Sequence, residues 1–174
     1  ASLSLLDLDI KFGLEALSDT FLPSGRGNKY VLSNSTENLI LVDDSYNANP
    51  NSVKAAVNLL KEIAKDKRKI LILGEMRELG QYSEQLHLSV IDIIIENEID
   101  VVMLVGDKTK CIYDNLKNKI KCLWQKSSKL LVDSDYTGLI FPGDYILVKG
   151  SRSMSMELIV KNLKKIYPPI QEGM

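Results

Sequence analysis

The chain has 174 residues, of which 45% are hydrophobic and 26% are charged, and its formal net charge is −1. Basic and acidic residues are interspersed, so no stretch is basic enough to follow a phosphate backbone, which excludes a nucleic-acid module. No apolar run approaches the ~18 residues that cross a bilayer, and the acidic start of the chain lacks the basic region of a signal peptide. We therefore expect a soluble globular protein that binds neither nucleic acid nor membrane.

The first 25 residues differ from the rest of the chain. L-D-I-K-F-G-L-E-A-L (residues 8–17) favours a helix, and the Pro, Gly and Ser residues of 21–28 are typical of a linker. We place a domain boundary near Gly25.

From residue 29 onward, predicted strands and helices alternate. Continuous apolar runs predict strands at 38–43, 70–73, 101–105, 120–123 and 145–148. Apolar residues at helical spacing, together with start and stop signals, predict helices at 53–64, 83–97, 109–118, 127–135 and 153–166. Strands that are apolar throughout are covered on both faces. The sequence therefore predicts an α/β fold, a Rossmann-like open, mostly parallel sheet with helices on both faces.

Polar segments follow four of these strands, at residues 43–50, 74–80, 106–109 and 149–153. Because the carboxyl ends of parallel strands meet at one edge of a sheet, we expect these segments to converge on one rim, where ligands bind in such folds.

In the first of these segments, Asp44 is suited to accept hydrogen bonds from a ribose diol. The alternative is that Asp43, Asp44 and Ser45 only turn the chain before the next helix. Asn49 followed by Pro50 is typical of a helix start, so part of the segment is structural under either interpretation.

The other rim segments contain charged residues. Arg77 and Arg152 offer guanidinium forks for a phosphate or a carboxylate, although Glu75 and Glu78 are close enough in sequence to pair with Arg77 instead. Lys149 ends a buried strand, and we expect its charge to point into a crevice.

Other candidate residues have simpler interpretations. His87, the sole histidine, lies on an apolar helix and is expected to be a structural hydrogen-bonding residue. Tyr46 can stack on a base or merely pack. Cys111 and Cys122 are too few for a disulfide framework or a zinc site, so we expect free thiols and a reducing, cytoplasmic setting. The sequence has no phosphate-binding G-x-x-x-x-G-K-[ST] loop and no G-x-G-x-x-G after a strand.

Several ordered motifs resemble one family. They are G-R-G (25–27), D-D-S-Y-N-A-N-P-N-S (43–52), L-G-E-M-R-E-L-G (73–80) with Ser83 and His87, and V-K-G-S-R-S-M-S-M-E (148–157). Together they resemble the C-terminal domain of the Mur ligase family, in the branch that joins D-alanyl-D-alanine to UDP-N-acetylmuramoyl-tripeptide. The resemblance covers roughly residues 25–164.

The resemblance implies an ATP-dependent, ADP-forming ligase of peptidoglycan precursor synthesis that works through an acyl phosphate. It implies that residues 1–25 are the tail of the central ATPase domain and a linker, 26–167 the C-terminal domain and 168–174 a flexible tail. In the family, the P-loop and the Mg²⁺ site lie in the central domain, so we expect no metal site and no catalytic residue in this chain. The chain alone is expected to be inert, and the ligase a monomer that binds ATP and ADP.

The resemblance also implies roles for individual residues. The expected nucleotide-binding residues are Arg26, Asp44, Tyr46, Asn47 and Asn49. The residues expected to face the dipeptide are Arg77, Lys149 and Ser151. Glu75 stands where the family often has aspartate, a departure that leaves its role undefined.

Two alternatives come from other classes of protein. A phospho-acceptor receiver domain would use Asp43, Asp44, Asp107 and Lys149 after the strands of a similar sheet, although the spacing of Asp44 and Asp107 is wide for such a domain. A non-catalytic Rossmann-like binding module would respond to neither nucleotide nor dipeptide.

Overall fold

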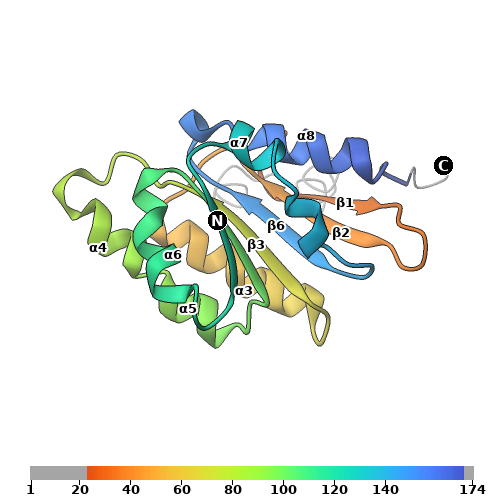
Figure 1. Cartoon of the computed structure of the whole chain (residues 1–174), viewed down its shortest axis with the longest axis horizontal. Coiled ribbons are helices and arrows are strands. Elements are labelled where there is room, and N and C mark those ends of the chain that lie inside the picture. Colours follow the sequence, from red (N-terminus) through yellow and green to blue (C-terminus); the bar gives the residue numbers. More distant parts are fainter. Residues whose placement is uncertain (1–22, 171–174) are drawn as a thin grey trace, which may run out of the picture.

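A six-stranded sheet forms the centre of the fold in the computed structural model, which describes residues 23–170 (Figure 1). The strands are β1 (Asn28–Leu32), β2 (Leu39–Asp44), β3 (Lys69–Gly74), β4 (Val101–Val105), β5 (Lys121–Gln125) and β6 (Tyr145–Lys149). Their spatial order is β1-β2-β6-β3-β4-β5. All neighbouring pairs are parallel except β1 with β2. The predicted Rossmann-like, mostly parallel sheet is confirmed.

Helices cover both faces of this sheet (Figure 1). On one face lie α3 (Pro50–Ala64), α4 (Ser83–Leu88), α5 (Ile91–Glu96) and α6 (Lys110–Leu116), and on the other α7 (Ser128–Val132) and α8 (Glu157–Ile166). In β3, Ile70 and Ile72 pack with α7 and α8, whereas Leu71 and Leu73 pack with α3 and α5. The strands are apolar throughout because alternate side chains enter two separate cores.

The start of α3 is fixed by its own sequence. The Asn49 side chain accepts a hydrogen bond from the Ser52 backbone N–H at 2.9 Å, and the Ser52 hydroxyl accepts one from the Asn49 N–H at 3.0 Å. Pro50 occupies the first turn, where a missing N–H has no cost. The predicted helix start is confirmed, and it ends the rim segment after β2.

The helix predicted at 83–97 is wrong as a single element, because the chain forms α4 and α5 with a turn between them. At the turn, the Ser89 hydroxyl donates to the Leu86 carbonyl at 2.8 Å and the Val90 N–H bonds the His87 carbonyl rather than Leu86. Such local side-chain bonds compete with the helical ladder.

Two other boundaries differ from the prediction. α8 begins at Glu157 rather than near residue 153, because Ser155 has a left-handed φ of 51° that interrupts a helix. β1 was not predicted, and it is a short edge strand beside the expected linker.

The C-terminal end of the described chain lies against the sheet. Ile170 N–H donates to the Val31 carbonyl at 2.9 Å, so residues 168–170, predicted to begin a tail, are tied to β1. The helix predicted at 8–17 lies outside the described residues. Within residues 23–170, no helix has the length and apolar character needed to cross a membrane.

Candidate functional site

The carboxyl ends of four parallel strands form the rim of the candidate site. Ser151, after β6, donates its backbone N–H to the Glu75 carbonyl after β3 at 3.0 Å, and its hydroxyl accepts from the Arg77 N–H at 2.8 Å. Glu75 Oε1 in turn accepts from the Lys108 N–H after β4 at 2.8 Å. These bonds join the segments after β6, β3 and β4. The Ser151 hydroxyl also lies 3.5 Å from the Ala48 carbonyl oxygen in the segment after β2, so the predicted convergence of all four segments is confirmed.

Lys149 and Asp44 form an ion pair at the centre of this rim. They are register partners at the ends of the parallel strands β6 and β2, so their side chains leave the same face of the sheet. Lys149 Nζ lies 2.6 Å from Asp44 Oδ2 and 3.0 Å from the Asn47 carbonyl oxygen. The Lys149 side chain is 3% exposed and that of Asp44 is 26% exposed. Asp44 Oδ1 accepts no hydrogen bond from the described residues, which leaves it available to a ligand.

The neighbouring residues of the segment have structural roles. Buried Asp43 accepts hydrogen bonds from the Ser45 hydroxyl at 2.6 Å and its N–H at 3.2 Å, which forms a local turn. The Asn47 side chain accepts from the Ala48 N–H at 2.8 Å, and Asn49 caps α3. The turn interpretation therefore applies to Asp43 and Ser45, while Asp44 faces the rim.

A polar pocket of about 260 Å³ gathers the five predicted nucleotide-binding residues and Lys149. It is lined by Arg26, Asp44, Tyr46, Asn47, Ala48, Asn49, Ser52 and Lys149. The Arg26 guanidinium lies 4.3 Å from the centroid of the Tyr46 ring, and the Tyr46 N–H donates to the Gly25 carbonyl at 3.0 Å. A pocket with a cation, an aromatic face and a carboxylate can bind a sugar diol beside an anion.

A second polar pocket of about 430 Å³ adjoins the first and shares Tyr46 and Asn47 with it. Its remaining lining residues are Arg77, Glu78, Ser151, Arg152 and Ser153. Two of the three residues predicted to face the dipeptide, Arg77 and Ser151, lie here, whereas Lys149 lies in the first pocket. Arg152, whose guanidinium can bind a phosphate or a carboxylate, also lies here, although the family resemblance implies no role for it.

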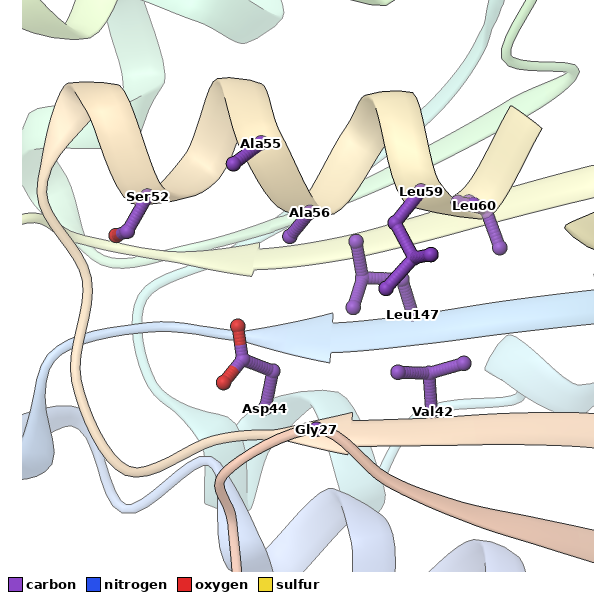
Figure 2. A pocket seen from close by; sticks show the side chains of 9 residues that line it. All are labelled: Gly27, Val42, Asp44, Ser52, Ala55, Ala56, Leu59, Leu60 and Leu147. Atoms are coloured by element: carbon purple, nitrogen blue, oxygen red, sulfur yellow. The ribbon is translucent and has the colours of Figure 1, made fainter. Parts of the chain in front are cut away.

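A third pocket, of about 300 Å³, is an apolar groove between α3 and strands β2 and β6 (Figure 2). Val42, Ala55, Ala56, Leu59, Leu60 and Leu147 line most of it, and Asp44 and Ser52 close the end shared with the first polar pocket. Because its walls are almost entirely apolar, polar recognition at this rim is concentrated in the two other pockets.

Glu75 lies beneath the rim and is 3% exposed. Arg77 Nε approaches its Oε2 to 3.0 Å, but this contact is not aligned as a hydrogen bond. Gly106, with a φ of 105°, packs on Glu75 so closely that a Cβ there would lie 2.4 Å from Glu75 Cγ. Glu75 therefore supports the rim from below.

His87 has a structural role, as predicted. It is fully buried, its Nε2 accepts from the Met76 N–H at 3.0 Å, and its Nδ1 lies 2.7 Å from the Ser83 carbonyl oxygen. Because Met76 N–H is a donor and the carbonyl an acceptor, the proton sits on Nδ1 of a neutral ring. Burial lowers the pKa of His87 below its usual 6.5. The histidine thus fixes the rim segment that follows β3.

The receiver-type arrangement does not form. Asp107 follows β4, three strands from β2 in the sheet order, which is ~14 Å at ~4.8 Å per strand. Asp43 accepts a hydrogen bond from the Ser45 hydroxyl, and Asp44 is paired with Lys149. Among residues 23–170, no group of three His, Cys, Asp or Glu side chains is placed to hold a metal ion.

The family model and the similar proteins all indicate the same family. Residues 30–152 match the sequence model of the family described as Mur ligase, glutamate ligase domain. A UDP-N-acetylmuramoyl-tripeptide–D-alanyl-D-alanine ligase of Rickettsia prowazekii is 38% identical over 158 residues, which is 91% of this chain and 34% of that protein. The Bacillus subtilis enzyme of the same name is 32% identical over 142 residues, 79% of this chain and 30% of that protein. The chain thus spans about a third of the length of these relatives.

Solved structures show the same fold. MurF from Acinetobacter baumannii superposes with a TM-score of 0.73 at 25% identity, covering 94% of this chain and 35% of that one. A MurF ligase of Thermotoga maritima, solved in complex with ADP, gives a TM-score of 0.72 at 22% identity, with 94% of this chain and 35% of that one covered. The latter likeness establishes the fold.

Proposed function

The chain belongs to the Mur ligase family through its glutamate ligase domain, and we propose that it is the C-terminal domain of an ATP-dependent ligase joining D-alanyl-D-alanine to UDP-N-acetylmuramoyl-tripeptide. The observation that carries this proposal is the polar pocket at the carboxyl ends of β2 and β6, which combines Arg26, Asp44 and Tyr46. In this proposal, residues 26–167 form the domain, and residues 1–25 continue from a central ATPase domain.

The nucleotide occupies the first polar pocket. Asp44 keeps Oδ1 for a ribose hydroxyl because Lys149 engages only Oδ2. The Tyr46 ring offers a face next to the Arg26 guanidinium, 4.3 Å from its centroid, so the pair can contact the base and an anionic group. Asn47 and Asn49 complete the polar lining.

The reaction transfers the γ-phosphoryl group of ATP to the terminal carboxylate of the tripeptide and releases ADP. The amine of the dipeptide then attacks the acyl phosphate, forming the amide and releasing phosphate. Two adjoining pockets with a shared wall of Tyr46 and Asn47 are suited to bring a nucleotide and an amine close together. Closure of this domain over the nucleotide would exclude water from the reaction.

The phosphate-binding loop and the Mg²⁺ site are assigned to the central domain. The sequence has no P-loop motif, and the described carboxylates do not fit a metal site, since Asp44 is paired with Lys149 and Glu75 lies against Arg77. Half of the reacting site thus lies elsewhere, and we expect the chain alone to be catalytically inert.

The test is phosphate release by the complete gene product, supplied with ATP, Mg²⁺, UDP-N-acetylmuramoyl-tripeptide and D-alanyl-D-alanine. Release should require the dipeptide, and Asp44→Ala should raise the KM for ATP about 10- to 100-fold, the effect of losing a charge-assisted hydrogen bond. Asp44→Asn removes the charge but keeps the shape of the side chain, so it shows which of the two losses raises the KM for ATP. Asp107→Ala, an exposed carboxylate on the same rim, is the matched control and should leave the KM unchanged.

The possible outcomes test the assigned reaction and the assigned role of Asp44 separately. Phosphate release that ignores the dipeptide would overturn the assigned reaction. Dipeptide-dependent release with equal KM values for wild type and Asp44→Ala would keep the reaction and remove Asp44 from the nucleotide site.

A further inference from the structure

A groove of about 410 Å³ lies between α7 and α8, on the face of the sheet opposite α3. The two helices lie side by side across this face (Figure 1). The residues that line the groove are Lys129, Val132, Leu158, Lys161, Asn162 and Lys165. None of them lines the polar pockets at the carboxyl ends of the strands, so the proposed ligase site leaves this groove without a role.

The helical period of α8 explains the mixed character of the lining. The four residues that α8 contributes stand at i, i+3, i+4 and i+7, on one face of the helix: Leu158, Lys161, Asn162 and Lys165. The buried residues of α8 point the other way, into the core. Leu158 is 42% exposed, and Leu130 on neighbouring α7 is 48% exposed. Lysines and large apolar side chains therefore share one solvent-facing surface.

The three lysines of the groove have no acidic partner. Lys129, Lys161 and Lys165 form no ion pair with any residue in 23–170, and no acidic residue lines the groove. Together α7 and α8 contain four lysines and one acid, Glu157, a net charge of +3 in a chain whose net charge is −1. Asp133 follows α7 but does not line the groove. This surface therefore attracts anions.

The residue types favour a lipid surface over a protein partner. Protein interfaces are enriched in arginine and aromatic residues and depleted in lysine, whereas lysine is the only charged residue of this groove. Lysines beside exposed leucines are typical of surfaces that rest on anionic membranes. The ammonium groups reach the lipid phosphates on their long stems, while the apolar side chains enter the boundary of the acyl chains.

We propose that the α7–α8 groove is a docking surface for an anionic lipid bilayer, with Lys129, Lys161 and Lys165 against the headgroups and Leu130 and Leu158 at the acyl boundary. The expectation that the chain binds no membrane was drawn from the lack of a spanning segment and of a signal peptide. Contact with the bilayer surface requires only exposed lysines and apolar side chains. The inference goes beyond the proposed ligase function and does not depend on it.

The test is cosedimentation of the complete gene product with vesicles of equal parts phosphatidylglycerol and phosphatidylcholine, and with vesicles of phosphatidylcholine alone. Wild type should bind the anionic vesicles more strongly, and added salt should weaken this binding because exposed charges are screened. Each lysine close to an anionic surface changes the partition about 5-fold. Replacing Lys129, Lys161 and Lys165 together with glutamine should therefore weaken binding to the anionic vesicles roughly 100-fold.

A matched control replaces Lys54, Lys119 and Lys121 with glutamine. These lysines are also exposed and form no ion pair with a described residue. Both triple variants lower the net charge by the same amount, so a difference between them reports the position of the charges. The control should bind the anionic vesicles nearly as well as wild type. The urea midpoints of both variants should match that of wild type, because exposed side chains contribute little to stability.

Three outcomes would overturn the inference. They are equal binding of wild type to the two kinds of vesicle, equal losses of binding in the two triple variants, and binding of poly-glutamate without binding of vesicles. The last result would assign the groove to an acidic protein. The vesicle assay measures no catalysis, so the ligase reaction is tested separately, by phosphate release.

Discussion

Replacing Lys149 with methionine tests how the rim is held together. Methionine retains most of the length and apolar stem of lysine but removes the charge. Lys149 Nζ is shared between Asp44 Oδ2 at 2.6 Å and the Asn47 carbonyl at 3.0 Å, and the lysine side chain is only 3% exposed. We therefore expect Lys149→Met to destabilise the fold and to loosen the segment that carries Asp44.

The magnitude follows from the separation and the exposure of the two partners. At 2.6 Å and an effective dielectric constant of about 20, the attraction is about 6 kcal/mol before desolvation is subtracted. Breaking a fully buried pair costs about 3–5 kcal/mol because the remaining charge is stranded. Asp44 is 26% exposed and recruits water when left alone, so we expect a smaller loss of about 2–3 kcal/mol.

The assay is equilibrium urea unfolding of wild type, Lys149→Met, Asp44→Asn and the double variant. If the pair is the cause, the double variant should be less destabilised than the sum of the single ones. A loss below about 0.5 kcal/mol for Lys149→Met, with additive effects, would refute the reasoning. In the complete gene product, the same variant should raise the KM for ATP and spare that for the dipeptide, because Lys149 lines the nucleotide pocket.

Two further predictions concern stability. Burial holds the folded pKa of His87 below its unfolded value near 6.5, so the unfolded chain binds a proton at a higher pH than the folded chain does. The free energy of unfolding should therefore fall as the pH falls from about 6.5 toward the folded pKa. His87→Gln should flatten this slope in urea titrations between about pH 5 and 7. Asn49→Ala removes the side-chain acceptor that bonds the Ser52 N–H and should lower the free energy of unfolding by about 1 kcal/mol. The control variant Asn51→Ala, on the exposed first turn of α3, should leave the stability close to that of wild type. Equal losses of stability for the two variants would contradict a capping role for Asn49.

Local signals in the sequence were enough for the fold class. β3 and β4 are apolar at every position from Ile70 to Leu73 and from Val101 to Val105, which predicts coverage on both faces wherever the strands lie in the sheet. The start of α3 depends on Asn49, Pro50 and Ser52, which are close in sequence, so it too was predictable.

Elements that depend on competing local bonds were not predictable in this way. The apolar spacing of 83–97 continues across the break between α4 and α5. The helix is nevertheless interrupted there, where the Ser89 hydroxyl donates a hydrogen bond to the Leu86 carbonyl. β1 is short and begins with two polar residues, Asn28 and Lys29, and it becomes a strand because β2 offers a free edge.

The sequence by itself determined that polar segments follow the strands of a parallel sheet, and hence that they share one rim. Which side chains meet there was decided by the tertiary structure. β6, the last strand in the chain, lies between β2 and β3, and this order brings Lys149 to Asp44 and Ser151 to Arg77. Strand order is set by how whole helices and strands pack, so contacts between residues 105 and 74 positions apart leave no local pattern to read.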